Sequence, residues 1–223
     1  MIITTDRYQI RSASSNEYDY WAQDVFPSWM GLTRFHPNPR RGPGHGVEPH
    51  YHDGDEIWLF TVGRGEIWLD DKIYPITPNT IIYTPMGVVH RFQMFTDVEN
   101  VDILGPLERQ KRGIHILVDV HGPPEPSVSG FTVPGAENTG PIKNRGTRCP
   151  LSELRLVTWS AGEGIEVGQL PRNEHWAVVR GRVEVQVDDL TVELTNGDLA
   201  LMRAGATRSL RALDDTSIVL MAE

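Results

Sequence analysis

The chain has 223 residues, of which 39% are hydrophobic, and a formal net charge of −9 at pH 7. This length suits one large domain or two small ones, and a chain of this size buries roughly 70% of the surface that it exposes when unfolded. The acidic balance, with no basic cluster beyond Arg40-Arg41, argues against nucleic acid and membranes as partners.

The sequence indicates neither a leader segment nor a disulfide. Residues 1–7 lack the apolar core of a signal peptide, and no stretch approaches the length of a membrane span. Cys149 is the only cysteine, and it lies in a segment typical of a loop. A reducing, cytoplasmic location is therefore expected.

The first segments in chain order offer two candidate site residues. Residues 8–27 are rich in aromatic side chains but have no clean periodicity, and are interpreted as an arm that packs on the other half of the chain or on another subunit. A strand is predicted over residues 29–35, where Arg34 is either an anchor for a substrate carboxylate or phosphate or a solvated strand-end arginine. His45, in the proline-rich stretch 39–49, either covers the site or faces water.

The most specific pattern in the chain lies between residues 44 and 90. It consists of Gly44, His50, His52, Glu56, Gly63, Pro85, Gly87 and His90. Side chains two apart on a strand project from the same face, so His50 and His52 can aim at one point. Imidazoles with a carboxylate suit Fe, Mn, Ni, Cu or Zn better than Ca or Mg. The pattern thus predicts a site for one divalent transition metal ion.

Short runs of β-forming residues surround this pattern and indicate antiparallel strands separated by turns. They cover residues 57–62, 66–69, 73–77 and 80–84 in the first half and 176–179, 183–187, 191–195 and 199–202 in the second half. Residues 114–118 are predicted to form a further strand. Residues 122–150 are rich in Gly and Pro and are predicted to be a connection on the surface.

A constant shift of 118 residues superimposes the second half on the first. Glu56 falls on Glu174, Trp58 on Trp176 and Gly63 on Gly181. The histidines do not repeat, because His50, His52 and His90 fall on Gly168, Leu170 and Arg208. One remaining carboxylate does not hold a transition metal. The second copy is therefore predicted to be free of metal, with a structural or dimer-like role or a separate ligand pocket around Arg208.

Two aromatic residues near the histidines are further candidates. Tyr83 stands where the second copy has Leu201, and its phenol is either a proton carrier near the metal or a bonded hydroxyl in the barrel wall. Phe92 lies two residues after His90 and is either an apolar wall of the substrate pocket or a core residue.

Together the two halves of the pattern resemble the two motifs of the cupin superfamily, whose members are small antiparallel jelly-roll barrels. The chain departs from these motifs at Asn79, usually Gly, and at Met94, usually Asn. The resemblance covers roughly residues 44–95 and 162–213. It implies an all-β protein with two fused barrels: a metal-binding barrel over 1–121, the connection 122–150 and a degenerate barrel over 151–223. The commonest cupin ligand set, three histidines and one carboxylate, implies that His50, His52, Glu56 and His90 bind the metal.

The superfamily resemblance leaves three functions open. The preferred one is a metal-dependent isomerase or epimerase of a sugar or keto acid, with His45, Tyr83 or Glu56 as proton carrier. The second is an Fe- or Cu-dependent dioxygenase whose substrate pocket is lined by Phe60 and Phe92. The third is a binding protein without catalysis. In all three cases the partner is a small molecule, and the protein is expected to be a monomer or a homodimer.

Overall fold

The computed structural model describes residues 2–11, 29–35, 47–52, 54–69, 72–105, 115–121, 131–133 and 151–223. These residues form two units, one with the described residues between 29 and 133 and the other with residues 2–11 and 151–223. The only helix in the described ranges is α1 (Val118–His121), which is too short to cross a membrane. All other regular elements are strands, so the predicted all-β class is confirmed.

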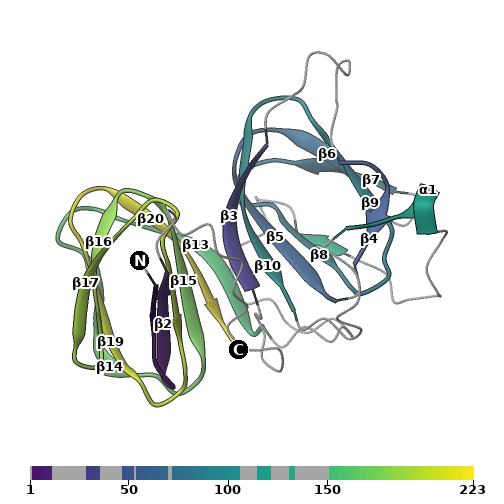
Figure 1. Ribbon diagram of the computed structural model, residues 1–223. Coiled ribbons are helices and arrows are strands. Elements are labelled where there is room, and N and C mark those ends of the chain that lie inside the picture. Colours follow the sequence, from purple (N-terminus) through teal and green to yellow (C-terminus); the bar gives the residue numbers. More distant parts are fainter. Residues whose placement is uncertain are drawn as a thin grey trace. The chain divides into compact units, whose positions relative to one another are not determined.

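The N-terminal unit is a barrel of two five-stranded antiparallel sheets (Figure 1). The first sheet has the order β12 (Phe131–Val133), β8 (Ile81–Thr84), β5 (Glu56–Val62), β10 (Val98–Leu104) and β3 (Trp29–Phe35). The second has the order β11 (Ile116–Leu117), β4 (His50–Tyr51), β9 (His90–Met94), β6 (Gly65–Leu69) and β7 (Lys72–Ile76). Non-consecutive neighbours in both sheets give the jelly-roll connectivity.

Apolar side chains fill the interior of this barrel. On β6, Gly65, Ile67 and Leu69 are buried while the residues between them are partly exposed, which is the pattern of a strand with one face in the core. The core cluster joins these strands through Trp58, Phe60, Ile67, Leu69, Ile76, Ile82, Val88, Phe92, Met94 and Val98.

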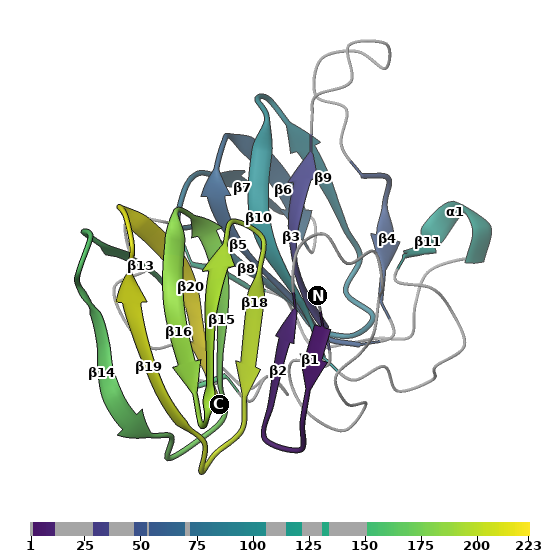
Figure 2. The same cartoon turned by 60° about the vertical axis from the view of Figure 1, so that its left-hand side comes forward.

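The C-terminal unit is a second barrel of the same design, seen in Figure 2. Its six-stranded sheet has the order β1 (Ile2–Thr4), β2 (Tyr8–Arg11), β18 (Leu199–Met202), β15 (Glu174–Arg180), β20 (Thr216–Ala222) and β13 (Glu153–Trp159). Its four-stranded sheet has the order β14 (Gly164–Gln169), β19 (Thr207–Ala212), β16 (Arg182–Val187) and β17 (Leu190–Thr195). The core is built around Trp176 and the valines of β16.

The ends of the predicted domains differ from the observed units. Strand β2 pairs with β18, Tyr8 opposite Met202 and Arg11 opposite Leu199, so the N-terminal residues complete the C-terminal barrel rather than the first one. Backbone groups at the edge of β18 would otherwise lack partners, which explains why a distant strand is added there. Likewise, the predicted connection contains β12, which pairs with β8 in the N-terminal barrel. The strand predicted at 114–118 is shorter, because α1 begins at Val118.

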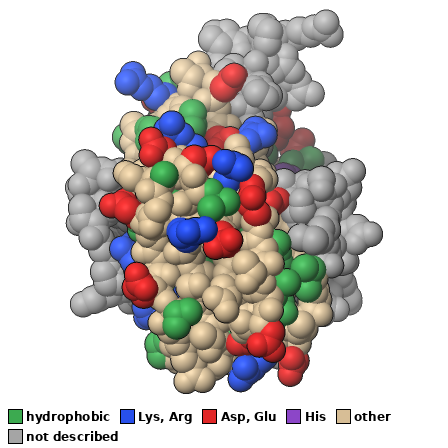
Figure 3. All heavy atoms as spheres, turned by 90° about the vertical axis from the view of Figure 1, so that its left-hand side faces the viewer, with side chains coloured by type: hydrophobic (Ala, Val, Ile, Leu, Met, Phe, Trp, Pro, Cys, Tyr) green, Lys and Arg blue, Asp and Glu red, His purple; other side chains and the backbone are tan. Residues whose placement is uncertain are grey.

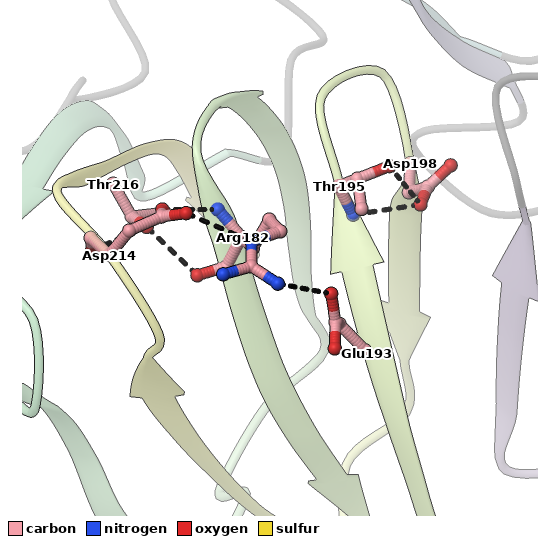
Figure 4. Close-up of polar contacts among 6 residues, drawn as sticks. All are labelled: Arg182, Glu193, Thr195, Asp198, Asp214 and Thr216. Carbon is pink, nitrogen blue, oxygen red and sulfur yellow. Dashed lines mark hydrogen bonds and ion pairs between the residues drawn. The ribbon is translucent and has the colours of Figure 1, made fainter.

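The repeat seen in the sequence is also a repeat of turns. Gly63 and Gly181 both have a positive φ, 96° and 77°, and a Cβ at either would overlap the chain that follows β9 or β19. The backbone N–H of the next residue is held in both copies, Arg64 by Thr96 Oγ1 at 2.9 Å and Arg182 by Asp214 Oδ1 at 2.7 Å (Figure 4). Asn79, with φ 66°, takes the position of Gly197, with φ 91°. Asparagine adopts left-handed backbone more readily than most residues other than glycine, which explains why Asn79 can stand where the motif usually has Gly.

Charges on the C-terminal barrel are mixed. The face in Figure 3 shows acidic and basic side chains interspersed. Exposed side chains of this barrel also form ion pairs across neighbouring strands, including Arg182 with Glu193 and Arg211 with Glu184. Exposed pairs of this kind contribute little to stability. The charges on this face therefore compensate one another and form no basic surface.

Candidate metal centre

Three buried histidines meet in the N-terminal barrel. His50 on β4 is directly opposite His90 on β9, and His52 follows β4 by one residue. Candidate ligand atoms of the three side chains all lie within 4.8 Å of one another, and each residue is at most 2% exposed. The jelly-roll pairing of β4 with β9 thus brings together residues that are 40 positions apart in the chain.

Backbone carbonyls orient two of these imidazoles. Nδ1 of His50 lies 2.7 Å from the carbonyl oxygen of Glu48, and Nδ1 of His90 lies 2.9 Å from that of Val88. A carbonyl only accepts, so Nδ1 carries the proton in each ring and Nε2 keeps its lone pair. Among the described residues, Nε2 of His50 and of His90 has no hydrogen-bond partner. In both rings, therefore, the Nε2 lone pair is available to bind a metal ion at the centre of the histidine cluster.

Glu56, the first residue of β5, faces the same point. Its Oε2 lies 2.9 Å from His52 Nε2 and 3.7 Å from His90 Nε2, and its side chain is 1% exposed. Glu56 also forms a side-chain hydrogen bond with Asp102 of β10. The Glu56 carboxylate thus borders the cluster formed by the three imidazoles.

In the absence of a cation, burial favours the neutral forms of His50, His90 and Glu56. Burial, with the neighbouring charge of His52, lowers the pKa of His50 to about 3. The same causes lower the pKa of His90 well below its usual range. Burial raises the pKa of Glu56 well above its usual range, and it raises that of Asp102 together with the charge of Glu56. A bound cation would reverse these penalties, because it favours the lone pair and the carboxylate.

A hydrogen-bonded clamp fixes the loop between His52 and Glu56. Asp55 Oδ2 accepts a 2.7 Å bond from the Tyr83 hydroxyl, and Asp55 Oδ1 accepts a 2.9 Å bond from the Met86 N–H. The Gly87 N–H donates to the His52 carbonyl at 2.9 Å. This clamp ties His52 and Asp55 to the turn that precedes His90.

The clamp defines where the predicted residue Tyr83 lies. Its hydroxyl is buried and bonded to Asp55, which matches the interpretation of a bonded hydroxyl in the barrel wall. In the C-terminal barrel, Leu201 takes its place and Asn173 Oδ1 accepts the Ala204 N–H at 2.9 Å. The backbone bond is thus shared by both barrels, whereas the phenol is added only in the first.

His115 is a site residue that sequence reasoning missed. Its ring centroid lies 4.4 Å from that of His50 and 5.4 Å from that of His52, and the residue is exposed. Burial followed by the charge of His52 lowers the pKa of His115 to about 4. The pairing of β11 with β4 places it there. A histidine before a short apolar run carries no sequence signal of this contact.

The aromatic candidates lie beside the histidines. The Phe92 ring is 6.1 Å from His90 and 4.6 Å from Trp58, and Phe60 packs 6.0 Å beyond Phe92. Both phenylalanines belong to the barrel core. Phe92 therefore forms the apolar side of the histidine cluster, and Phe60 lies deeper in the interior.

The remaining predicted residues are not brought to the cluster. Arg34 forms a 2.8 Å ion pair with Glu99, its partner on the neighbouring strand, and its side chain is 55% exposed. This is the geometry of a strand-end arginine in solvent. His45 lies outside the described residues.

The C-terminal barrel has a different arrangement at the equivalent positions. Arg208 Nη2 donates to Glu174 Oε2 at 3.2 Å, and Trp176 Nε1 donates to Glu174 Oε1 at 2.6 Å. The carboxylate thus has a guanidinium as its counterion. Gly168 and Leu170 offer no donor atom at the places of His50 and His52.

The N-terminal cluster fits a divalent transition metal ion. Its donor atoms are buried, converge on one point and, for His50 and His90, lack any other partner among the described residues. Nitrogen donors with one carboxylate match the preferences of such ions. This barrel can therefore hold a metal ion, for which the C-terminal barrel offers only Glu174 at the equivalent positions.

Comparison with known proteins agrees with this reading of the fold. Residues 40–104 match the family model described as "Cupin domain". The N-terminal barrel is a cupin domain. Protein SchB of Streptomyces halstedii is 38% identical over 68 residues, which cover 29% of the chain and 49% of that protein. The uncharacterized protein y4oW of Sinorhizobium fredii is 29% identical over 77 residues, which cover 34% of the chain and 36% of that protein. The chain thus spans less than half the length of either relative.

Solved structures extend the likeness to both barrels. The oxalate decarboxylase of Bacillus subtilis, which has Mn(II) centres, superimposes with a TM-score of 0.61 at 14% identity, covering 86% of the chain and 67% of that protein. Salicylate 1,2-dioxygenase from Pseudaminobacter salicylatoxidans gives a TM-score of 0.57 at 12% identity, covering 91% of the chain and 72% of that protein. At this identity the likeness establishes the fold alone. The chain therefore has a bicupin fold.

Proposed function

We propose that the N-terminal cupin barrel is a metal-dependent enzyme that acts on a small polar metabolite and isomerises or epimerises a sugar or keto acid. The observation that supports it best is the proximity of the buried histidine cluster to an exposed imidazole, His115, whose ring centroid lies 4.4 Å from that of His50. Such a pair offers a cation site and a proton carrier side by side. The compounds named in the two structural relatives, oxalate and salicylate, are also small polar molecules.

The residues would divide the work as follows. His50, His52, His90 and Glu56 would hold the cation, which supplies Lewis acidity to a substrate carbonyl. His115, the exposed imidazole beside them, would remove the proton from the neighbouring carbon and return it. Phe92 and Trp58 would keep water from the apolar side of the substrate.

A dioxygenase is the second candidate, and one observation favours it. The wall beside His90 is aromatic, with Trp58 at 5.1 Å and Phe92 at 6.1 Å between ring centroids. An apolar or aromatic substrate would fit such a wall better than a sugar. In this case His115 would orient the substrate rather than carry a proton.

Solvent exchange separates the two candidates. The full chain, loaded in turn with Mn, Fe, Ni, Cu or Zn, is incubated in D₂O with a panel of keto acids and sugars, and deuterium uptake next to the carbonyl is followed by NMR. We expect uptake with at least one metal, and we expect His115→Gln to lose it while keeping its metal. Substrate-triggered oxygen consumption without deuterium uptake would replace the isomerase by the dioxygenase.

A further inference from the structure

Both barrels carry the same Glu-x-Trp sequence at the start of equivalent strands, β5 and β15, but the two carboxylates have different partners. In the C-terminal barrel, the Trp176 indole donates to Glu174 Oε1 at 2.6 Å. In the N-terminal barrel, Glu56 Oε2 is directed at His52 and His90 and accepts no hydrogen bond from the described residues. The same Glu-x-Trp sequence thus places its carboxylate against the tryptophan in one barrel and against histidines in the other.

The residue opposite the tryptophan differs between the barrels. Asp102 on β10 stands opposite Trp58, and Leu220 on β20 stands opposite Trp176. Leu220 offers no acceptor. Because a buried indole N–H without an acceptor is unfavourable, the Trp176 indole bonds to the carboxylate two residues before it. This carboxylate, Glu174, is the equivalent of Glu56.

Asp102 has contacts that account for the other arrangement. Its carboxyl forms side-chain hydrogen bonds with both Trp58 and Glu56. The bond to Trp58 gives the indole N–H an acceptor other than Glu56. The bond to Glu56 restricts rotation of that carboxyl group. Both effects leave an oxygen of Glu56 available to the histidines.

We infer that Asp102 is a positioning residue for the metal centre: it binds the Trp58 indole and thereby keeps Glu56 directed at the three histidines. The inference rests on the proposed metal site and names a determinant of its affinity. Loss of a partner that orients a metal ligand typically weakens binding by about 10- to 100-fold.

The test is a titration of the metal-free full chain with Co(II), followed by its absorption bands and by calorimetry. Asp102→Leu, which gives the N-terminal barrel the residue of the C-terminal one, is expected to weaken Co(II) binding by about 10- to 100-fold. Asp102→Asn retains an acceptor for the indole and a donor for Glu56, so its affinity should stay close to that of the wild type. Adding Trp58→Phe to Asp102→Leu should restore most of the affinity, because no indole N–H remains to bind Glu56.

The rescue separates positioning from a general structural role, which removal of the indole would not repair. Wild-type affinity in Asp102→Leu, or a double variant that binds no more tightly than Asp102→Leu, would overturn the inference. If circular dichroism shows Asp102→Leu unfolded, Asp102→Ala is tested with and without Trp58→Phe against the same criteria. His90→Ala is titrated in parallel: if it retains Co(II), the metal site itself fails, and if it alone loses Co(II), only the role of Asp102 fails.

Discussion

The two barrels share strands and turns but differ in the side chains at one point. Strands β8 and β18, and β10 and β20, are related by the same shift of 118 residues, and the glycine turns repeat with them. At the donor cluster, however, Arg208 replaces His90 and forms an ion pair with the shared carboxylate, Glu174. The fold is therefore maintained without metal ligands in one copy. The barrel that has the ligands for a metal ion differs from the one that lacks them at a few interior positions, those of His50, His52 and His90.

Among the variants that test this difference between the barrels, His90→Ala should have the largest effect on metal binding. Removing one buried donor should weaken metal binding by about 100-fold or more, while the apolar core keeps the barrel folded. The matched control is Arg208→Ala at the equivalent position of the C-terminal barrel, which should leave the metal content unchanged. Metal content after dialysis and circular dichroism measure both outcomes. Loss of metal from Arg208→Ala would show that the two barrels are coupled at the site.

A buried histidine unrelated to metal distinguishes the C-terminal barrel. His175 takes the place of Ile57, and burial followed by the charge of Arg203 lowers its pKa to about 3. Between pH 6.5 and 3 the unfolded chain binds a proton here that the folded chain does not, so stability falls as the pH falls. The slope contributed by His175 is at most about 1.4 kcal/mol per pH unit.

His175→Gln should therefore flatten the decline of stability below pH 6.5, as measured by urea unfolding at several pH values. Glutamine can still accept the Met202 N–H that His175 Nδ1 accepts at 3.3 Å. Because the metal-site histidines are present in both proteins, the difference between the two curves isolates His175. Parallel curves would mean that this side chain is protonated or solvated in the folded state.

The smallest effect should come from Tyr83→Phe. This change removes the phenol bond from the clamp and leaves only the bond to the backbone, as in the C-terminal barrel. Loss of the hydroxyl bond to Asp55 should cost about 1 kcal/mol of unfolding free energy. Metal affinity and deuterium exchange should change little, since Met86 still holds Asp55. If exchange were abolished with stability and metal intact, Tyr83 would instead be the proton carrier.

The sequence was sufficient for the parts of the molecule that depend on local patterns. Alternating apolar residues and turn glycines predict the strands, and the spacing of His50, His52 and His90 predicts the cluster that the structure brings together. His115 and Asp102 could not be found this way. His115 reaches the site only through the pairing of β11 with β4, and Asp102 reaches Glu56 only through its register opposite Trp58.

The predicted domain boundaries differ from the observed units because strands pair over long distances in the sequence. The sequence predicts an arm at the N-terminus that packs on the other half of the chain or on another subunit, and residues 8–11 form a strand on β18 of the C-terminal barrel, nearly two hundred positions away. The pattern gave no sign of the strand itself. The short strand β12 lies inside a stretch whose Gly and Pro content predicts only a connection. Neither pairing leaves a mark on composition, because a strand of three or four residues needs few apolar side chains.

The central claim is that one barrel binds a cation and the other does not. Crystals of the chain grown with Mn(II), Co(II) or Zn(II) would test it most directly through anomalous scattering at the metal edge. The account predicts one strong peak per chain, bonded to Nε2 of His50, His52 and His90 and to an oxygen of Glu56. No peak between these four side chains, or an equal peak beside Glu174, would contradict it.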